Sequence, residues 1–154
     1  VIARVASGTS WFDSTPGTVT ATNPAAVYVA SLTFTPTAQL NSAINTKVRE
    51  YLDSCAAQKT LVPKKCPFAG FTAQRISAGP LWTIEKYPVI EISESDGEWR
   101  VSGAGKVRLD VSLVDFATEK TEKFSEVLSF TLSGTIAGLT EGTPRLVVEN
   151  TVER

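Results

Sequence analysis

The 154-residue sequence predicts an α+β fold, with one long helix packed on a curved four- to five-stranded antiparallel β-meander and short β-strands before it. Apolar residues recur at helical spacing over residues 38–57, and they alternate with polar residues in several later segments. The helix precedes these strands instead of interleaving with them, which is the element order of an α+β domain. The apolar face of the sheet needs a cover, and the apolar stripe of the helix can supply it.

The first 36 residues are rich in Thr, Ser, Ala and Val, and their only charged residues are Arg4 and Asp13. Three short strands, separated by the turn-forming segments DSTPG and TNPA, are predicted at residues 1–7, 17–22 and 26–34. A segment this short cannot bury a core alone. We therefore divide the chain into residues 1–36, a connector or the tail of an upstream β-module, and an α+β domain at residues 37–154.

The helix is predicted from residue 38 to about residue 57. Thr37 follows Pro36 and is a suitable N-cap, because its side-chain oxygen can accept a hydrogen bond from the first helical turn. The apolar positions form one stripe: Leu40, Ala43, Ile44, Val48, Tyr51, Leu52 and Cys55. Most charged residues of the segment fall on the opposite face, as expected for a helix that covers a sheet.

Strand signals return after the second cysteine. LWTIEKYPVIEIS and EWRVS flank ESDG, in which the dipeptide Asp96-Gly97 predicts a hairpin turn. Alternating patterns then predict strands at residues 107–114, 124–136 and 145–149. The segment SGAGKV only partly matches a phosphate-binding loop, because Arg100 and Val107 stand where that motif needs Gly and Ser or Thr. A glycine bulge or turn is predicted there.

The chain contains no histidine, so it lacks the commonest general base and the Ser-His and Cys-His pairs. Two cysteines are too few for a structural zinc site. The acidic segment EISESDGE lacks the spacing of a calcium loop and predicts a solvated hairpin tip. Paired carboxylates for glycoside chemistry and a Ser-Lys dyad stay open, without positive support. We therefore predict no catalytic residue, no cofactor and no metal ligand, and we expect a protein that is not an enzyme.

The two cysteines, Cys55 and Cys66, are predicted to form a disulfide. Cys55 ends the helix, where the helix dipole disfavours a thiolate. Lys64 and Lys65 could lower the pKa of Cys66, but the spacing is not CxxC and no base is at hand. A disulfide closing this short loop contributes roughly 3 kcal/mol on the loop-entropy model. Such bonds persist in oxidising compartments, so an extracytoplasmic location is expected.

The net charge of −1 gives no general attraction to nucleic acid or anionic lipid. The charge is uneven, because residues 37–80 carry six basic and two acidic residues while residues 81–154 carry eight and thirteen. No apolar segment approaches the roughly 18 residues needed to span a bilayer, so any membrane anchor is expected upstream of Val1. The expected partner is an unidentified envelope protein or polymer.

Residues 57–72 are predicted to form a contact surface, because cationic and aromatic side chains are interleaved in this loop. With one nearby arginine, the candidate residues are Lys59, Lys64, Lys65, Phe68, Phe71 and Arg75. This mixture suits anionic envelope polymers or an acidic protein patch. The alternative is that Phe68 and Phe71 plug the end of the helix–sheet core. Trp82, Tyr87 and Trp99 are likewise predicted to lie in the core, with a concave ligand site as the alternative.

The segment YLDSCAAQKTLVPKKCPF, followed by LWTIEKYPVIEIS and EWRVSG, resembles extracytoplasmic domains of actinobacterial membrane-anchored or secreted proteins of unknown function. The resemblance covers residues 51–68, 82–88 and the strands beyond. It implies a cell-envelope location, often with an N-terminal transmembrane helix and a small β-module, and it implies no activity. The helix-then-meander order is also similar to cystatin-like and nuclear-transport-factor-2-like folds, although a fold does not transfer function.

The function expected from these observations is a non-enzymatic extracytoplasmic domain that binds or positions a partner at the cell envelope. The alternative is a small-ligand binding cone of the nuclear-transport-factor-2-like type, with a lipid or a glycan as its ligand.

Overall fold

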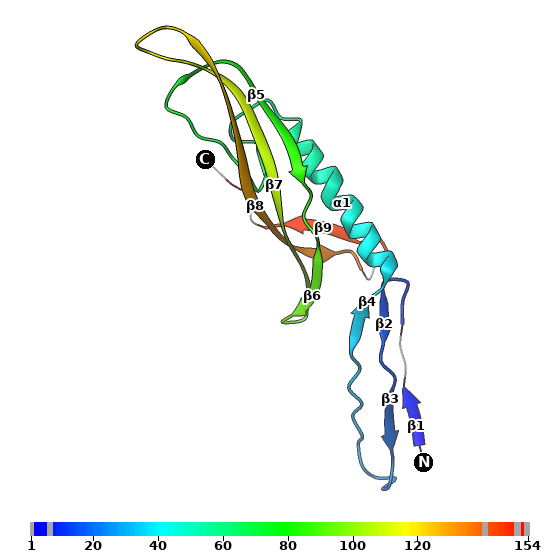
Figure 1. Cartoon of the computed structure of the whole chain (residues 1–154). Coiled ribbons are helices and arrows are strands. Elements are labelled where there is room, and N and C mark those ends of the chain that lie inside the picture. The colour runs from blue at the N-terminus through cyan, green and yellow to red at the C-terminus, as the bar shows by residue number, and fades with distance from the viewer. Residues whose placement is uncertain (1, 6–7, 140–141, 150–151, 153–154) are drawn as a thin grey trace. The chain divides into compact units, whose positions relative to one another are not determined.

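The computed structural model describes residues 2–5, 8–139, 142–149 and 152, and the chain divides into two compact units (Figure 1). The first unit is Val1–Ala43 and the second is Ile44–Arg154. The division falls inside the single described helix, α1 (Ala38–Ala56), and therefore a few residues later than the sequence division at residue 36. One helix against a curved antiparallel sheet, with short strands before it, confirms the predicted α+β class.

The first unit contains two antiparallel strand pairs. β1 (Ile2–Val5) pairs with β3 (Gly17–Thr20), and β2 (Phe12–Ser14) pairs with β4 (Phe34–Pro36). The strands predicted at residues 1–7 and 17–22 are therefore confirmed in shortened form, with residues 1, 6 and 7 outside the described part. β2 was not predicted, because three residues are too few to show an alternating pattern.

The strand predicted at residues 26–34 is wrong, since of these residues only Phe34 belongs to a strand. The side chains of Val27 and Val29 are 92% and 85% exposed. The Tyr28 hydroxyl accepts hydrogen bonds from the backbone N–H groups of Thr22 (2.8 Å) and Asn23 (2.7 Å), which folds the segment back on itself. Alternation alone does not make a strand, because cross-strand pairing and burial supply most of its stability.

Helix α1 (Ala38–Ala56) confirms the predicted helix to within one residue. The Thr37 hydroxyl accepts a hydrogen bond from the backbone N–H of Leu40 (3.3 Å), as expected for the N-cap. The fully buried positions form one stripe: Leu40, Ile44, Val48, Leu52 and Cys55. Residues 44–56 of the helix lie along one face of the sheet of the second unit (Figure 1).

That sheet has five antiparallel strands in the order β5-β7-β8-β9, with β6 also paired to β7. Its strands are β5 (Arg75–Lys86), β6 (Glu91–Ser95), β7 (Glu98–Val114), β8 (Thr121–Ala137) and β9 (Arg145–Val148). β5 and β6 lie end to end along the same edge of β7. The apolar segment 81–93 is thus two strands, and its break contains Pro88, which cannot donate a ladder hydrogen bond.

The core of the second unit lies between α1 and the sheet. On β7, Val107, Leu109, Val111 and Leu113 are buried, and on β8 Phe130 and Leu132 face the same side. This confirms the predicted alternation in both strands. The Phe68 ring packs against Trp82 (5.0 Å between ring centroids) and Phe130 (5.5 Å). Val114 is also buried, although the alternation assigned it to the opposite face.

The predicted glycine bulge in SGAGKV is wrong, because Gly103 and Gly105 lie in an uninterrupted register between β7 and β8. A Cβ at Gly105 would lie 2.5 Å from Cζ of Phe130, and a Cβ at Gly103 would lie 2.8 Å from the backbone oxygen of Val89. The glycines therefore permit close approach of neighbouring groups. The register shifts lie instead along β5, between Ile76 and Ala78, between Ala78 and Leu81, and between Ile84 and Lys86.

Candidate functional site

The disulfide between Cys55 and Cys66 is present and confirms the predicted pairing. It joins the end of α1 to a loop whose conformation is also held by side chains. The Gln58 amide accepts a hydrogen bond from the backbone N–H of Lys64 (2.8 Å) and donates one to its carbonyl (3.2 Å). The Tyr51 hydroxyl donates to the carbonyl of Lys65 (2.6 Å). Three hydrogen bonds thus hold the backbone of the two neighbouring lysines.

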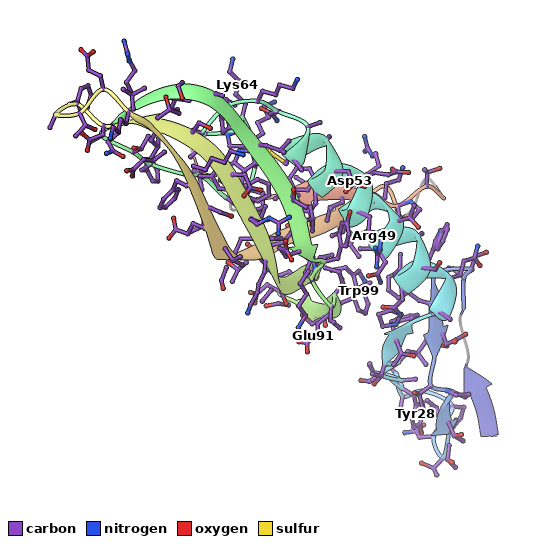
Figure 2. The ribbon with its side chains drawn as sticks, turned by 45° about the horizontal axis from the view of Figure 1, so that its top comes forward. Tyr28, Arg49, Asp53, Lys64, Glu91 and Trp99 are labelled. Atoms are coloured by element: carbon purple, nitrogen blue, oxygen red, sulfur yellow. A yellow bond between two sulfur atoms is a disulfide. The ribbon has the colours of Figure 1, made fainter. Side chains whose placement is uncertain are left out.

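The sequence explains why the chain turns sharply at this point. Pro63 is fully buried and stiffens the approach to the lysines. Lys65 has a φ of 57°, an uncommon conformation for a residue with a Cβ, and the bond from Tyr51 helps to hold it. Burial raises the pKa of the Tyr51 phenol to about 12, so the hydroxyl keeps its proton at neutral pH. Lys64 lies on this loop beyond the end of α1 (Figure 2).

Phe68 is not part of a binding surface, which corrects the sequence-based candidate. Its side chain is only 3% exposed, because it fills the end of the core against Trp82 and Phe130. The Trp82 indole N–H donates to the carbonyl of Thr60 (2.8 Å) and ties the loop to the sheet. Trp82 therefore belongs to the core, as predicted, whereas Tyr87 and Trp99 are half-buried.

Phe71, by contrast, is 76% exposed. It borders a pocket of about 540 Å³ whose other walls include Leu61, Val62, Lys64, Lys65 and Val152. The backbone N–H of Gly70 donates to the carbonyl of Leu61 (2.8 Å), and that of Val152 donates to the carbonyl of Cys66 (2.8 Å). These two bonds fold the loop over itself and bring a residue from far along the chain to the pocket. We call this hollow the loop pocket.

A second, smaller hollow of about 230 Å³ shares Leu61, Phe71 and Thr72 with the loop pocket. It lies against the sheet, and its remaining walls are Gln74, Leu109, Val111, Leu113 and Phe124. Its described lining contains no charged side chain. We call it the sheet hollow. Phe71 is therefore the large aromatic side chain that borders both.

Lys64 and Lys65 bring positive charge to the loop pocket only. Neither ammonium group forms an ion pair with a residue in the described part of the chain. Lys59 and Arg75, the other two predicted cations, are exposed but do not line this pocket. Of the six residues predicted as a contact surface, the structure thus brings three together at the pocket: Lys64, Lys65 and Phe71.

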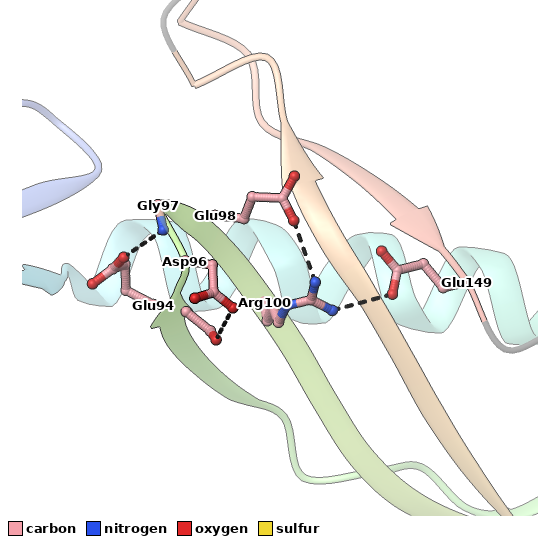
Figure 3. A network of polar contacts seen from close by, with 7 residues as sticks. Glu94, Asp96, Gly97, Glu98, Arg100 and Glu149 are labelled. Carbon is pink, nitrogen blue, oxygen red and sulfur yellow. Dashed lines mark hydrogen bonds and ion pairs between the residues drawn. The ribbon is translucent and has the colours of Figure 1, made fainter.

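The acidic hairpin tip lies between β6 and β7, where Asp96 and Gly97 both have positive φ, as in a two-residue hairpin turn. Glu94 accepts a hydrogen bond from the backbone N–H of Gly97 (2.9 Å), and Arg100 lies between Glu98 (3.3 Å) and Glu149 (3.4 Å) (Figure 3). These carboxylates are engaged in turn and surface contacts. No group of three Asp, Glu, Cys or His residues placed to hold a metal occurs among the described residues.

A third cluster joins α1 to the segment after β5. Arg49 and Asp53 both lie on α1 (Figure 2). The Arg49 guanidinium lies over the Tyr87 ring, 4.4 Å from its centroid, and the Tyr87 hydroxyl donates a hydrogen bond to Asp53. This hydrogen bond, and to a lesser extent burial, raises the pKa of Tyr87. Each member has a partner within the cluster, which fastens the helix to the sheet edge. Tyr87 is therefore a partner of two charged helix residues and not the core aromatic that the sequence predicts, and no sequence pattern indicates these two contacts.

Comparison of the chain with protein-family models, with curated proteins and with solved structures finds no match. Among the described residues, no helix has both the length and the apolar character needed to cross a membrane.

Proposed function

We propose that this chain is a non-catalytic binding domain that works outside the cytoplasm and recognises an anionic partner at the loop pocket. The observation that carries the proposal is the pair Lys64 and Lys65, whose backbones are fixed beside an apolar pocket and whose ammonium groups have no ion-pair partner in the described chain. An anionic group entering the pocket would have two lysine side chains within the pocket lining to pair with. A preorganised loop also loses little conformational entropy on binding.

The location proposed for this function rests on the disulfide. A disulfide fits an oxidising environment, and such bonds are rare in the reducing cytoplasm. A cell-envelope setting is the finer proposal, and the sequence resemblance to extracytoplasmic domains supports it.

Binding is favoured over catalysis by the chemistry of the site. The loop pocket offers two ammonium groups, a threonine pair and apolar walls, and the chain has no histidine to move a proton. The alternative, a ligand cone between helix and sheet, has less support. The side chains at that interface, including Ile44, Leu52 and Leu132, are fully buried and fill the space.

The test is a binding titration with defined polyanions, polyphosphate and poly-glutamate, and with neutral dextran for comparison. The double variant Lys64→Glu/Lys65→Glu should lower affinity for both polyanions by roughly tenfold or more, because a tenfold change needs only about 1.4 kcal/mol. Lys106→Glu/Lys120→Glu makes the same change in net charge at exposed positions outside the loop, so it is the matched control. Equal losses in the two double variants would contradict a site at the loop pocket.

A further inference from the structure

The two adjoining hollows differ in polarity. Lys64 and Lys65 line the loop pocket, whereas the described lining of the sheet hollow is uncharged and includes Leu109, Val111 and Phe124. Leu61, Phe71 and Thr72 line both hollows. A ligand occupying both would therefore meet cations at one end and apolar side chains at the other.

Two aromatic side chains that line the hollows are exposed. Phe71 is 76% exposed although the neighbouring Phe68 is fully used in the core, and Phe124 on the far wall of the sheet hollow is 43% exposed. Within the described part of the chain, neither side chain takes part in a ring contact like that of Phe68 with Trp82. Contiguous exposed apolar surface rimmed by charge is typical of a binding site.

We infer that the two hollows bind a single-chain amphipathic anion. Its carboxylate or phosphate group contacts the ammonium groups of Lys64 and Lys65, and its unbranched apolar chain passes Phe71 into the sheet hollow. This inference rests on the proposed function, because it names the ligand class of the same pocket. The loop pocket, at about 540 Å³, lies within the roughly 300–1,000 Å³ typical of small-molecule sites.

The volume of the sheet hollow limits how many alkyl chains the ligand can have. At about 230 Å³ it is less than half the size of the loop pocket, and Phe71 lines both. It suits one extended alkyl chain and is small for two. The ligand is therefore a monomeric amphiphile with one chain, and a two-chain lipid held in a bilayer is not the favoured occupant.

The experiment is calorimetric titration with alkyl carboxylates and alkyl phosphates of six to ten carbons, all below their micelle concentrations. Inorganic phosphate tests the head group alone, and decyl maltoside tests a neutral head on the same chain. Affinity should rise roughly fourfold for each added methylene that enters an apolar site. Decanoate or decyl phosphate should bind at least tenfold more tightly than decyl maltoside, and the weaker of the two anions identifies the head group that fits less well.

Two variants separate the ends of the site. Lys64→Glu/Lys65→Glu should abolish the preference for an anionic head, and Phe71→Ala should flatten the dependence on chain length. Phe116→Ala removes another phenylalanine of similar exposure, 69%, outside both hollows and should change neither property. Because all these side chains are exposed, thermal unfolding should be unaltered, which shows that each variant is folded.

The outcomes distinguish failure of this inference from failure of the proposed function on which it rests. If polyanion binding depends on the lysines but no amphiphile shows chain-length dependence, the proposed function stands and the amphiphile is excluded. If the affinity for polyanions and the affinity for amphiphiles are both independent of the lysines, both proposals fail. Binding only to vesicles of phosphatidylglycerol and phosphatidylcholine, with no binding of monomeric amphiphiles, would overturn the inference in favour of a membrane surface.

Discussion

Replacement of Ile44 by alanine should destabilise the second unit by about 2–5 kcal/mol. Ile44 is 0% exposed and lies in the middle of the buried stripe of α1. The change removes three carbon groups, each worth about 0.8 kcal/mol on transfer from water, and the unfilled cavity adds to that loss. The lower limit applies if neighbouring side chains relax into the space, and the upper limit applies if they do not.

Urea unfolding followed by tryptophan fluorescence measures this change. Trp82 is 3% exposed and lies in the core of the second unit, so its emission should shift when the core opens. Trp11 belongs to the first unit and would mix a second signal into the curve. A Trp11→Phe background leaves only Trp82 and Trp99, which both lie in the second unit. An unchanged urea slope would show that the variant altered stability and not the extent of unfolding.

Lys47→Ala is the matched control on the same helix. Its side chain is 51% exposed, and its ion pair with Glu50 spans 3.8 Å at the surface. Such pairs contribute little, so the cost should be below about 0.5 kcal/mol. Equal costs for Ile44→Ala and Lys47→Ala would refute the assignment of the buried face. A cost below about 1 kcal/mol for Ile44→Ala would show that this position is not closely packed.

Two further predictions concern the loop. Reducing the disulfide should lower the free energy of unfolding by roughly 3 kcal/mol, because Cys55 and Cys66 are 11 residues apart and the bond closes a short loop. Thiol titration of the unfolded, unreduced protein should find no free sulfhydryl. Two free thiols would contradict the pairing. The folded-state pKa of Tyr51 is raised from 10.0 to about 12, so its contribution to stability is complete below pH 10 and is lost as the pH rises through 12. Urea unfolding from pH 9 to 12 should therefore show a smaller decline for Tyr51→Phe than for the wild type, and parallel declines would contradict the shift.

The sequence predicted the elements whose side chains repeat at a fixed spacing. α1 was predicted to within one residue, because its buried positions recur every three or four residues. The alternation in β8 likewise predicted that Phe130 and Leu132 lie on the same, buried face of the strand. The same rule failed at residues 26–34, where alternation is present but no partner strand covers it. A periodic pattern thus predicts an element only if the fold supplies a neighbour for it.

The site could be predicted only in part, because loops have no period. Elimination of other cysteine chemistry predicted the disulfide, and composition drew attention to Lys64 and Lys65, which line the loop pocket. Nothing local distinguishes Phe68 from Phe71, since both are phenylalanines three residues apart in the same loop. Their different exposure depends on Trp82 and Phe130, which lie on distant strands. Composition also gave no indication that Val152 would complete the pocket.

The contacts that stabilise the loop are the same contacts that would prepare it for a ligand. The disulfide, the two hydrogen bonds between Gln58 and the Lys64 backbone, and the one from the Tyr51 hydroxyl all act on the short segment that carries Lys64 and Lys65. In an oxidised chain this segment is ordered before a ligand arrives, so little entropy is lost on binding. Reduction would leave only the hydrogen bonds to hold Lys65 at its positive φ, and the lysines would have to be ordered by the ligand itself. If the proposed function holds, binding at the loop pocket should therefore weaken when the disulfide is reduced, which would link that function to the proposed oxidising location.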